Sequence, residues 1–147
     1  MVAALGLGCG GSDPPVRDGT GAITRAGDLP VNEARIGDCY DEAEGADRPR
    51  MLAAVPCTVP HDREVFHRFE LAGDRYPGTE AVGLDAAEAC LDAFSGYVGV
   101  PYSRSALAAY PIVPSEDTWE DDDDRTVLCV LGQDEGPVTG TLRGAAR

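Results

Sequence analysis

The sequence predicts an α+β fold, in which a small antiparallel sheet packs against one main helix and two disulfides stabilise the domain. Three observations in this chain of 147 residues lead to that prediction. Residues 64–71 alternate in polarity, as in a half-buried strand. Residues 84–98 carry apolar side chains every three or four positions, as in a helix with one buried face. Four cysteines are spread through the body of the chain, and an even number permits two disulfides.

Several stretches predict the strands of the sheet. One face of strand 64–71 would carry Val65, His67, Phe69 and Leu71. Residues 126–131 are mostly apolar on both faces, which indicates a central strand. Residues 107–113 contain Pro111, which lacks an N–H group and therefore favours an edge strand. Shorter strands are expected near residues 38–40, 52–55 and 137–142.

The main helix is expected to bury a face made of Leu84, Ala87, Leu91, Phe94 and Val98. Asp85 and Glu88 lie in its first turn, where the helix dipole favours acidic side chains. A glycine at position 96 or 99 can end it. Because only one long helix is expected, the sheet would be covered on one face.

The four cysteines of the body lie at positions 39, 57, 90 and 129. They allow three pairings, among which the sequence alone does not choose. We favour Cys39–Cys57, which would close a short loop between neighbouring strands, and Cys90–Cys129, which would join the helix to the central strand. A zinc site is the alternative, but the spacings lack the paired Cys-x-x-Cys pattern of such sites.

The first nine residues predict a truncated lipoprotein signal (1–9). A short apolar run ends at Cys9, which would be the lipid-bearing residue, and a Gly/Pro-rich stretch follows. We therefore expect a flexible linker over residues 10–31, a folded domain over 32–142 and a short tail over 143–147. The signal and the disulfides place the domain on the extracytoplasmic face of the cell membrane, lipid-anchored, in an oxidising environment.

The net charge of −14 argues against binding through nucleic-acid phosphates or through anionic lipid head groups. All 12 basic residues are arginines, which is typical of a very GC-rich genome such as those of actinobacteria. No stretch approaches the 18 or more apolar residues of a membrane-spanning helix. Attachment to a membrane would therefore depend on the lipid anchor at Cys9.

A series of short elements has a recognisable order. They are Gly37-Asp-Cys39, Val55-Pro-Cys57, Pro60-His-Asp62 with Glu64-Val65, Tyr76-Pro-Gly78, the helical Cys90, Trp119 and the stretch from Arg125 to Cys129. Over residues 36–142 this order resembles the actinobacterial septum-formation domain, whose four cysteines match those of this chain. The resemblance implies an extracytoplasmic, membrane-attached domain linked to cell division, with no catalytic residues to transfer. The aspartates before Arg125 depart from the Gly-Asp-Arg turn expected there.

Candidate chemical groups are few. His61-Asp62 has the form of a phosphohydrolase metal pair, but His67 is the only other histidine, so a turn is the favoured interpretation. The serines lack the motif of a nucleophile with an adjacent base. The aromatic residues Tyr97, Tyr102, Tyr110 and Trp119 could line a ligand groove, although core positions are more common for them.

The acidic segment 116–124 is the one unusual surface feature, with seven carboxylates in nine positions. Hard cations prefer such oxygen ligands, so the candidate metal ligands are Asp121, Asp122, Asp123 and Asp124. The segment lacks the alternating register of an EF-hand, which favours a solvated loop instead.

The sequence thus predicts a non-catalytic, membrane-tethered interaction module linked to the cell envelope and the septum. Its partner would be a cell-envelope or divisome protein or the cell wall, and we expect no cofactor and no nucleic acid. The alternative is a small lipoprotein that binds a ligand or a divalent cation through the acidic segment.

Overall fold

Six antiparallel strands form the main sheet of the computed structural model, which describes residues 13–43 and 49–147. In spatial order they are β3 (Gly27–Pro30), β5 (Met51–Val55), β4 (Cys39–Asp41), β6 (Arg63–Glu70), β8 (Thr126–Gly132) and β7 (Ala108–Ile112). A separate two-stranded sheet pairs β1 (Val16–Arg17) with β2 (Ile23–Arg25). The helices are α1 (Thr79–Val98), α2 (Glu116–Asp121) and the 3₁₀ turns η1 (Val31–Glu33) and η2 (Tyr102–Arg104). The α+β class and the main helix are confirmed, whereas the prediction of a single small sheet is wrong.

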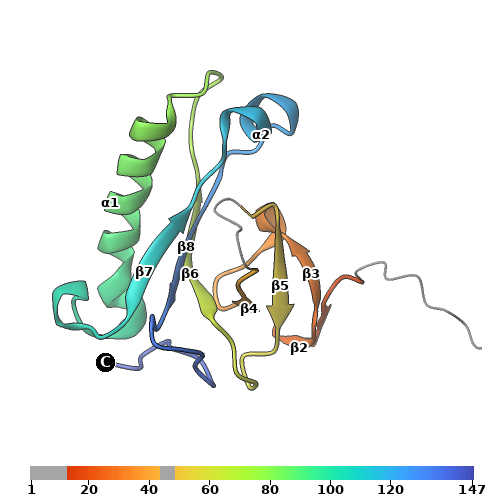
Figure 1. Ribbon diagram of the computed structural model, residues 1–147, viewed down its shortest axis with the longest axis vertical. Helices are drawn as coiled ribbons and strands as arrows, with labels where there is room; N and C mark the ends of the chain where they lie inside the picture. Colours follow the sequence, from red (N-terminus) through yellow and green to blue (C-terminus); the bar gives the residue numbers. More distant parts are fainter. Residues whose placement is uncertain (1–12, 44–48) are drawn as a thin grey trace, which may run out of the picture.

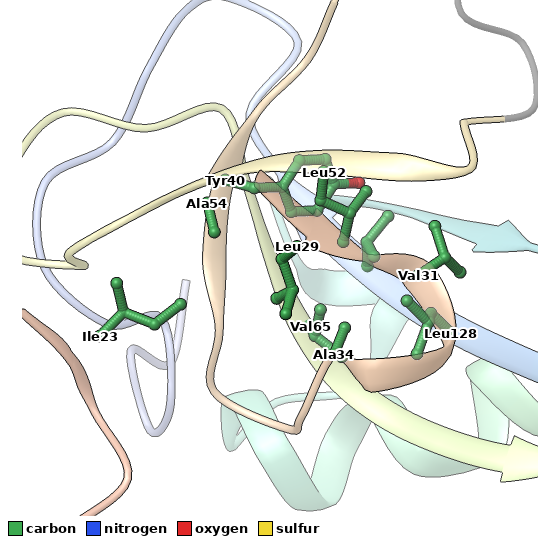
Figure 2. Close-up of a cluster of buried hydrophobic side chains, with 10 residues drawn as sticks. Ile23, Leu29, Val31, Ala34, Tyr40, Leu52, Ala54, Val65 and Leu128 are labelled. Atoms are coloured by element: carbon green, nitrogen blue, oxygen red, sulfur yellow. The ribbon is translucent and has the colours of Figure 1, made fainter. Parts of the chain in front are cut away.

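The main sheet separates two hydrophobic cores. One face of β6, β8 and β7 packs against α1, and β3 and β5 lie on the other side (Figure 1). The second core is formed because the N-terminal part of the sheet curves over the opposite face of β6 and β8. Val31 of η1 and Leu128 of β8 therefore belong to one buried cluster (Figure 2).

A β-bulge in β6 determines which side chains face each core. Val65 pairs with Val130 and His67 with Cys129, so Phe66 is an extra residue between these pairs. Val65 enters the core of the N-terminal strands, while Phe66 and Phe69 pack against the α1 side. The prediction that Val65 and Phe69 share a face is wrong, because the inserted residue reverses the alternation.

The buried face of α1 differs from the predicted one. The helix buries Val82, Ala86, Cys90, Phe94, Tyr97 and Val98. Leu84 and Leu91, which the sequence pattern places in the core, are 65% and 50% exposed. The disulfide from Cys90 to Cys129 fixes the helix rotation with Cys90 toward β8, and Leu91 lies about 100° away around a helix of 3.6 residues per turn. Gly99 ends α1 in a left-handed conformation, φ 96°.

Both favoured disulfide pairings are confirmed. Cys39 at the start of β4 is bonded to Cys57, just beyond β5, and Cys90 of α1 is bonded to Cys129 of β8. These bonds use all four cysteines of the body, so none of the four remains as a thiolate ligand for zinc.

The ends of the domain lie outside the predicted boundaries. Residues 13–31 fall in the predicted flexible linker, but they contain β1, β2 and β3, and Leu29 is buried in the core. Arg17 donates two hydrogen bonds to the Asp38 carboxylate, at 2.6 and 2.7 Å. Residues 143–147 are the predicted tail, but Gly144 N donates to Tyr97 O at 2.7 Å. The linker and tail predictions are therefore wrong for these residues, while residues 1–12, including Cys9, lie outside the described part.

Replacing Gly27 with alanine tests this packing of the N-terminal segment. A Cβ at Gly27 would overlap the backbone atoms Asp13 O and Pro15 N. We expect Gly27→Ala to lower the free energy of unfolding by about 1–3 kcal/mol in urea denaturation, as overpacking does. The matched control is Gly19→Ala, which has nothing within 4 Å of its Cβ and should be close to neutral. Equal stability of the two variants would mean that residues 13–15 do not pack on β3.

Candidate functional site

A buried polar cluster, defined as Cys39, Cys57, His61 and Glu64, lies where β4, β6 and the turn after β5 meet. Cys39 and Glu64 are register partners on adjacent strands, so their side chains share one face of the sheet. The sulfur of Cys39, a ring nitrogen of His61 and a carboxylate oxygen of Glu64 all lie within 4.8 Å of one another. These three residues are fully buried (0% exposed), whereas Cys57 is partly exposed.

Glu64 connects three parts of the chain through its carboxylate. Oε1 accepts hydrogen bonds from the Tyr97 hydroxyl of α1 and the Thr141 hydroxyl, each at 2.6 Å. Oε2 accepts one from the Leu142 backbone N–H, also at 2.6 Å. Burial and the hydrogen bond to Glu64 raise the pKa of Tyr97, which therefore remains a protonated donor. The segment 137–142, predicted as a strand, is instead held by these bonds and by an isolated bridge from Val138 to His61.

Only one of the two ring nitrogens of His61 has a hydrogen-bond partner among the described residues. Nδ1 is 2.9 Å from the Val59 carbonyl oxygen, which can only accept, so Nδ1 carries the proton in this contact. Nε2 is buried and has no hydrogen-bond partner among residues 13–43 and 49–147. With the proton on Nδ1, the neutral ring has a lone-pair acceptor at Nε2.

The cluster does not form a metal site in this oxidised state. Zinc takes cysteine as a thiolate, and Cys39 is bonded to Cys57. The His61-Asp62 pair also has a structural role, because the Asp62 carboxylate accepts the Glu42 backbone N–H at 2.9 Å. His67 lies on β6 beside Phe69, with ring centres 5.8 Å apart. His61-Asp62 is therefore a structural turn, as favoured from the sequence.

A second feature is an open groove of about 400 Å³ between β4 and β5 on one side and β7 on the other. We name it the seam groove, and its lining includes Tyr40, Asp41, Glu42, Met51, Tyr110 and Ile112. Met51 and Tyr110 are 48% and 40% exposed, so its walls present apolar side chains to solvent. The Tyr110 hydroxyl donates to Asp134 at 2.6 Å, and this hydrogen bond raises the pKa of Tyr110.

Comparison with known protein families decides the classification of the chain. The model of the family described as septum formation matches residues 36–146, about three quarters of the chain. The chain belongs to the septum-formation family. Membership links this domain to septum formation and cell division. No curated protein and no solved structure matches it.

The acidic segment of the septum-formation domain does not bring the candidate metal ligands together. Asp122 pairs with Arg50 at 3.4 Å and Asp123 with Arg125 at 3.1 Å. Asp124 Oδ1 instead accepts the Thr126 backbone N–H at 2.9 Å. The fourth candidate, Asp121, is an exposed residue at the end of α2. Among the described residues, the one group of three or more potential metal-ligating side chains is the set of Cys39, His61 and Glu64.

Asp123 stands where the glycine of a Gly-Asp-Arg turn was expected from the sequence. Its φ is 52°, in the left-handed region that glycine favours and aspartate tolerates better than most residues. A glycine would adopt this backbone conformation with less strain than Asp123.

The predicted aromatic groove is divided between separate places. Tyr110 lines the seam groove, whereas Tyr97 and Trp119 are buried and Tyr102 packs edge-on against Phe94, 5.1 Å between ring centres. Sequence reasoning missed Glu64 and Met51. Glu64 is identified only once its pairing with Cys39 is known, which the sequence pattern does not give. None of the helices in the described residues has the length and apolarity needed to span a bilayer.

Proposed function

We propose that this septum-formation domain is a membrane-tethered, extracytoplasmic and non-catalytic interaction module that binds another envelope or divisome protein through the seam groove. The observation that carries the proposal is the exposure of Met51 and Tyr110 on opposite walls of one groove. Exposed aromatic and methionine side chains grouped in a hollow are typical of protein interaction surfaces.

The charges around the groove define the chemistry of the partner. Asp41 and Glu42 belong to its lining, and the chain carries a net charge of −14. A segment of the partner protein would complement this surface if it placed an apolar side chain against the apolar wall of the groove and an arginine or lysine beside the two acidic residues. A nucleic acid or an anionic polymer would be repelled.

The tether and the compartment are also part of the proposal. Cys9, after its apolar run, supplies the lipid anchor, and two disulfides suit an oxidising compartment. Asp13 is already attached to β3, since its backbone oxygen accepts the Asp28 N–H at 2.9 Å. The four residues from Gly10 to Asp13 can span at most about 14 Å when extended. The domain would therefore lie close to the membrane surface, and its partner would present a membrane-proximal segment.

Changing both exposed walls of the groove tests the proposal. We expect Met51→Asp with Tyr110→Ser to remove septal enrichment of the tagged protein in its own cells, because the apolar contact is lost. Stability should fall by no more than about 1 kcal/mol, since both side chains are largely exposed. The measurements are immunofluorescence at the septum and the melting temperature of the purified variant.

The matched control is Leu84→Asp with Leu91→Asp, which adds charge at two exposed positions on α1. It should retain septal enrichment. Loss of enrichment in this control, with retention in the groove variant, would move the interaction surface to α1. In the same cells Cys9→Ser should release the protein from the membrane fraction, and retention there would contradict the lipid anchor.

A further inference from the structure

We infer that Cys39–Cys57 is an exchangeable disulfide that accepts two electrons from the dithiol of another protein, with Cys57 as the attacked sulfur and with His61 as the base that deprotonates Cys39 when the disulfide forms again. This activity goes beyond binding through the seam groove, and its chemistry depends on the buried polar cluster alone.

The two cysteines of this bond have unequal environments. Cys57 lies in the turn after β5 and is partly exposed, whereas Cys39 is fully buried. Exchange begins when a thiolate reaches one sulfur of a disulfide, and access decides which sulfur is attacked. The other disulfide provides an internal comparison, because both Cys90 and Cys129 are buried in the core between α1 and β8.

A base stands beside the buried sulfur. A ring nitrogen of His61, Cys39 Sγ and a Glu64 carboxylate oxygen all lie within 4.8 Å of one another. Of the two ring nitrogens, Nε2 is the one that lacks a hydrogen-bond partner among the described residues. Glu64 already accepts three hydrogen bonds, whereas His61 Nε2 accepts none among the described residues. A buried nitrogen without a partner is costly for stability, which makes a chemical use for it worth testing.

The environment of Cys57 favours a thiol rather than a second thiolate. The Gly37 carbonyl oxygen is 3.2 Å from Cys57 Sγ and 3.9 Å from Cys39 Sγ. After reduction the Cys57 S–H can donate to this oxygen, because a carbonyl accepts and does not donate. The proton of Cys39 can instead pass to His61.

The exchange is balanced in electrons and protons. A thiolate of the partner's dithiol forms a bond to Cys57 Sγ, the Cys39–Cys57 bond breaks, and its electron pair remains on Cys39 Sγ. The partner's second thiolate then attacks the partner sulfur of the mixed disulfide and releases Cys57. Two electrons pass to the cysteines, and the partner keeps a disulfide. The partner's two thiols lose their protons to solvent when they form thiolates, and the released Cys39 and Cys57 thiolates take up two protons from solvent. In the reverse step, His61 Nε2 takes the Cys39 proton and the thiolate attacks Cys57 of the mixed disulfide.

The test is reduction of the purified full chain with reduced glutathione, followed by acid quenching, alkylation and peptide mass spectrometry. We expect Cys39 and Cys57 to be alkylated at least about tenfold faster than Cys90 and Cys129, because access limits thiolate attack. Equal rates, or reduction of Cys90–Cys129 first, would overturn the inference.

Two single variants identify the attacked sulfur. Cys39→Ala leaves Cys57 free, and Cys57→Ala leaves Cys39 free, so both variants lose the same disulfide. With oxidised glutathione, free Cys57 should form the mixed disulfide at least about tenfold faster than free Cys39. The opposite order would assign the attack to Cys39 and contradict the proposed roles.

His61→Gln separates proton transfer from packing. Closure of the Cys57–glutathione mixed disulfide by Cys39 should be roughly 10²-fold slower, the lower end of general-base effects. The reduction rate of Cys90–Cys129 should stay unchanged, because a merely structural loosening of the domain would accelerate it. An unchanged closure rate, or faster reduction of both disulfides, would remove His61 from the mechanism.

Discussion

Replacing Glu64 with alanine is expected to lower the free energy of unfolding by about 3–5 kcal/mol, because each buried donor left without its acceptor costs about 1–3 kcal/mol. The carboxylate is fully buried and accepts hydrogen bonds from Tyr97, Thr141 and Leu142. Its removal leaves three donors without their acceptor, and these donors belong to α1 and to the C-terminal segment. Urea denaturation followed by far-UV circular dichroism measures the change.

Two further variants show whether the lost hydrogen bonds cause this change. Glu64→Gln keeps the side-chain volume and one acceptor oxygen, so it should destabilise less than alanine. Glu70→Ala removes an exposed carboxylate at the end of the same strand and should alter stability by no more than about 0.5 kcal/mol. A loss below about 1 kcal/mol for Glu64→Ala would mean that water replaces the carboxylate without cost.

Local sequence patterns predicted the class of the fold and much of its centre. Residues 126–131 form most of the fully buried β8, and Pro111 lies in β7 at the edge of the sheet. The disulfide pairing was also favoured correctly, because it joined stretches already expected to be neighbours. For β8 and β7, one local feature of the sequence was enough to predict the position of the strand in the sheet: a continuous apolar run for β8 and a proline without an N–H group for β7.

Predictions that depended on tertiary packing failed. The helix α1 is rich in alanine, so its sequence is compatible with two different buried faces. The disulfide from Cys90 to β8 determines which face is buried, and Leu84 lies outside that face. In β6 the bulge at Phe66 reversed the faces, and no residue in the pattern marks it. The N-terminal error has a similar cause: the Gly/Pro-rich stretch after Cys9 suggested a linker, but Gly27 allows the close approach of residues 13–15 to β3.

The candidate sites show the same division. The acidic segment was visible in the sequence, yet its aspartates have separate partners. The buried polar cluster was not visible as a unit, because it depends on the register that places Cys39 opposite Glu64. Cysteines and a histidine can be counted in a sequence, but their convergence is a property of strand pairing.

Trp119→Ala is expected to cost about 3–5 kcal/mol, as truncation of a large buried aromatic side chain does. Trp119 is 1% exposed, and its Nε1 donates to the Asp74 carbonyl at 3.1 Å. The Arg125 guanidinium lies 3.7 Å from the centre of the indole, and Tyr76 meets it edge-on. The indole thus joins α2 to the loop before α1 and to the start of β8. Because it is the only tryptophan, circular dichroism rather than intrinsic fluorescence must follow unfolding.

The control Trp119→Phe separates packing from the indole's specific contacts. Phenylalanine keeps an aromatic ring for Arg125 but loses the N–H donor to Asp74, so we expect a smaller loss, about 1–2 kcal/mol. Septal localisation of Trp119→Phe should be unchanged, because the indole lies outside the lining of the seam groove. Loss of localisation in a stably folded Trp119→Phe protein would contradict this assignment. Unchanged localisation would mean that Trp119 and Arg125, two of the residues that carry the family resemblance, stabilise the fold and do not bind the partner. The proposed binding surface would then remain with exposed residues such as Met51 and Tyr110.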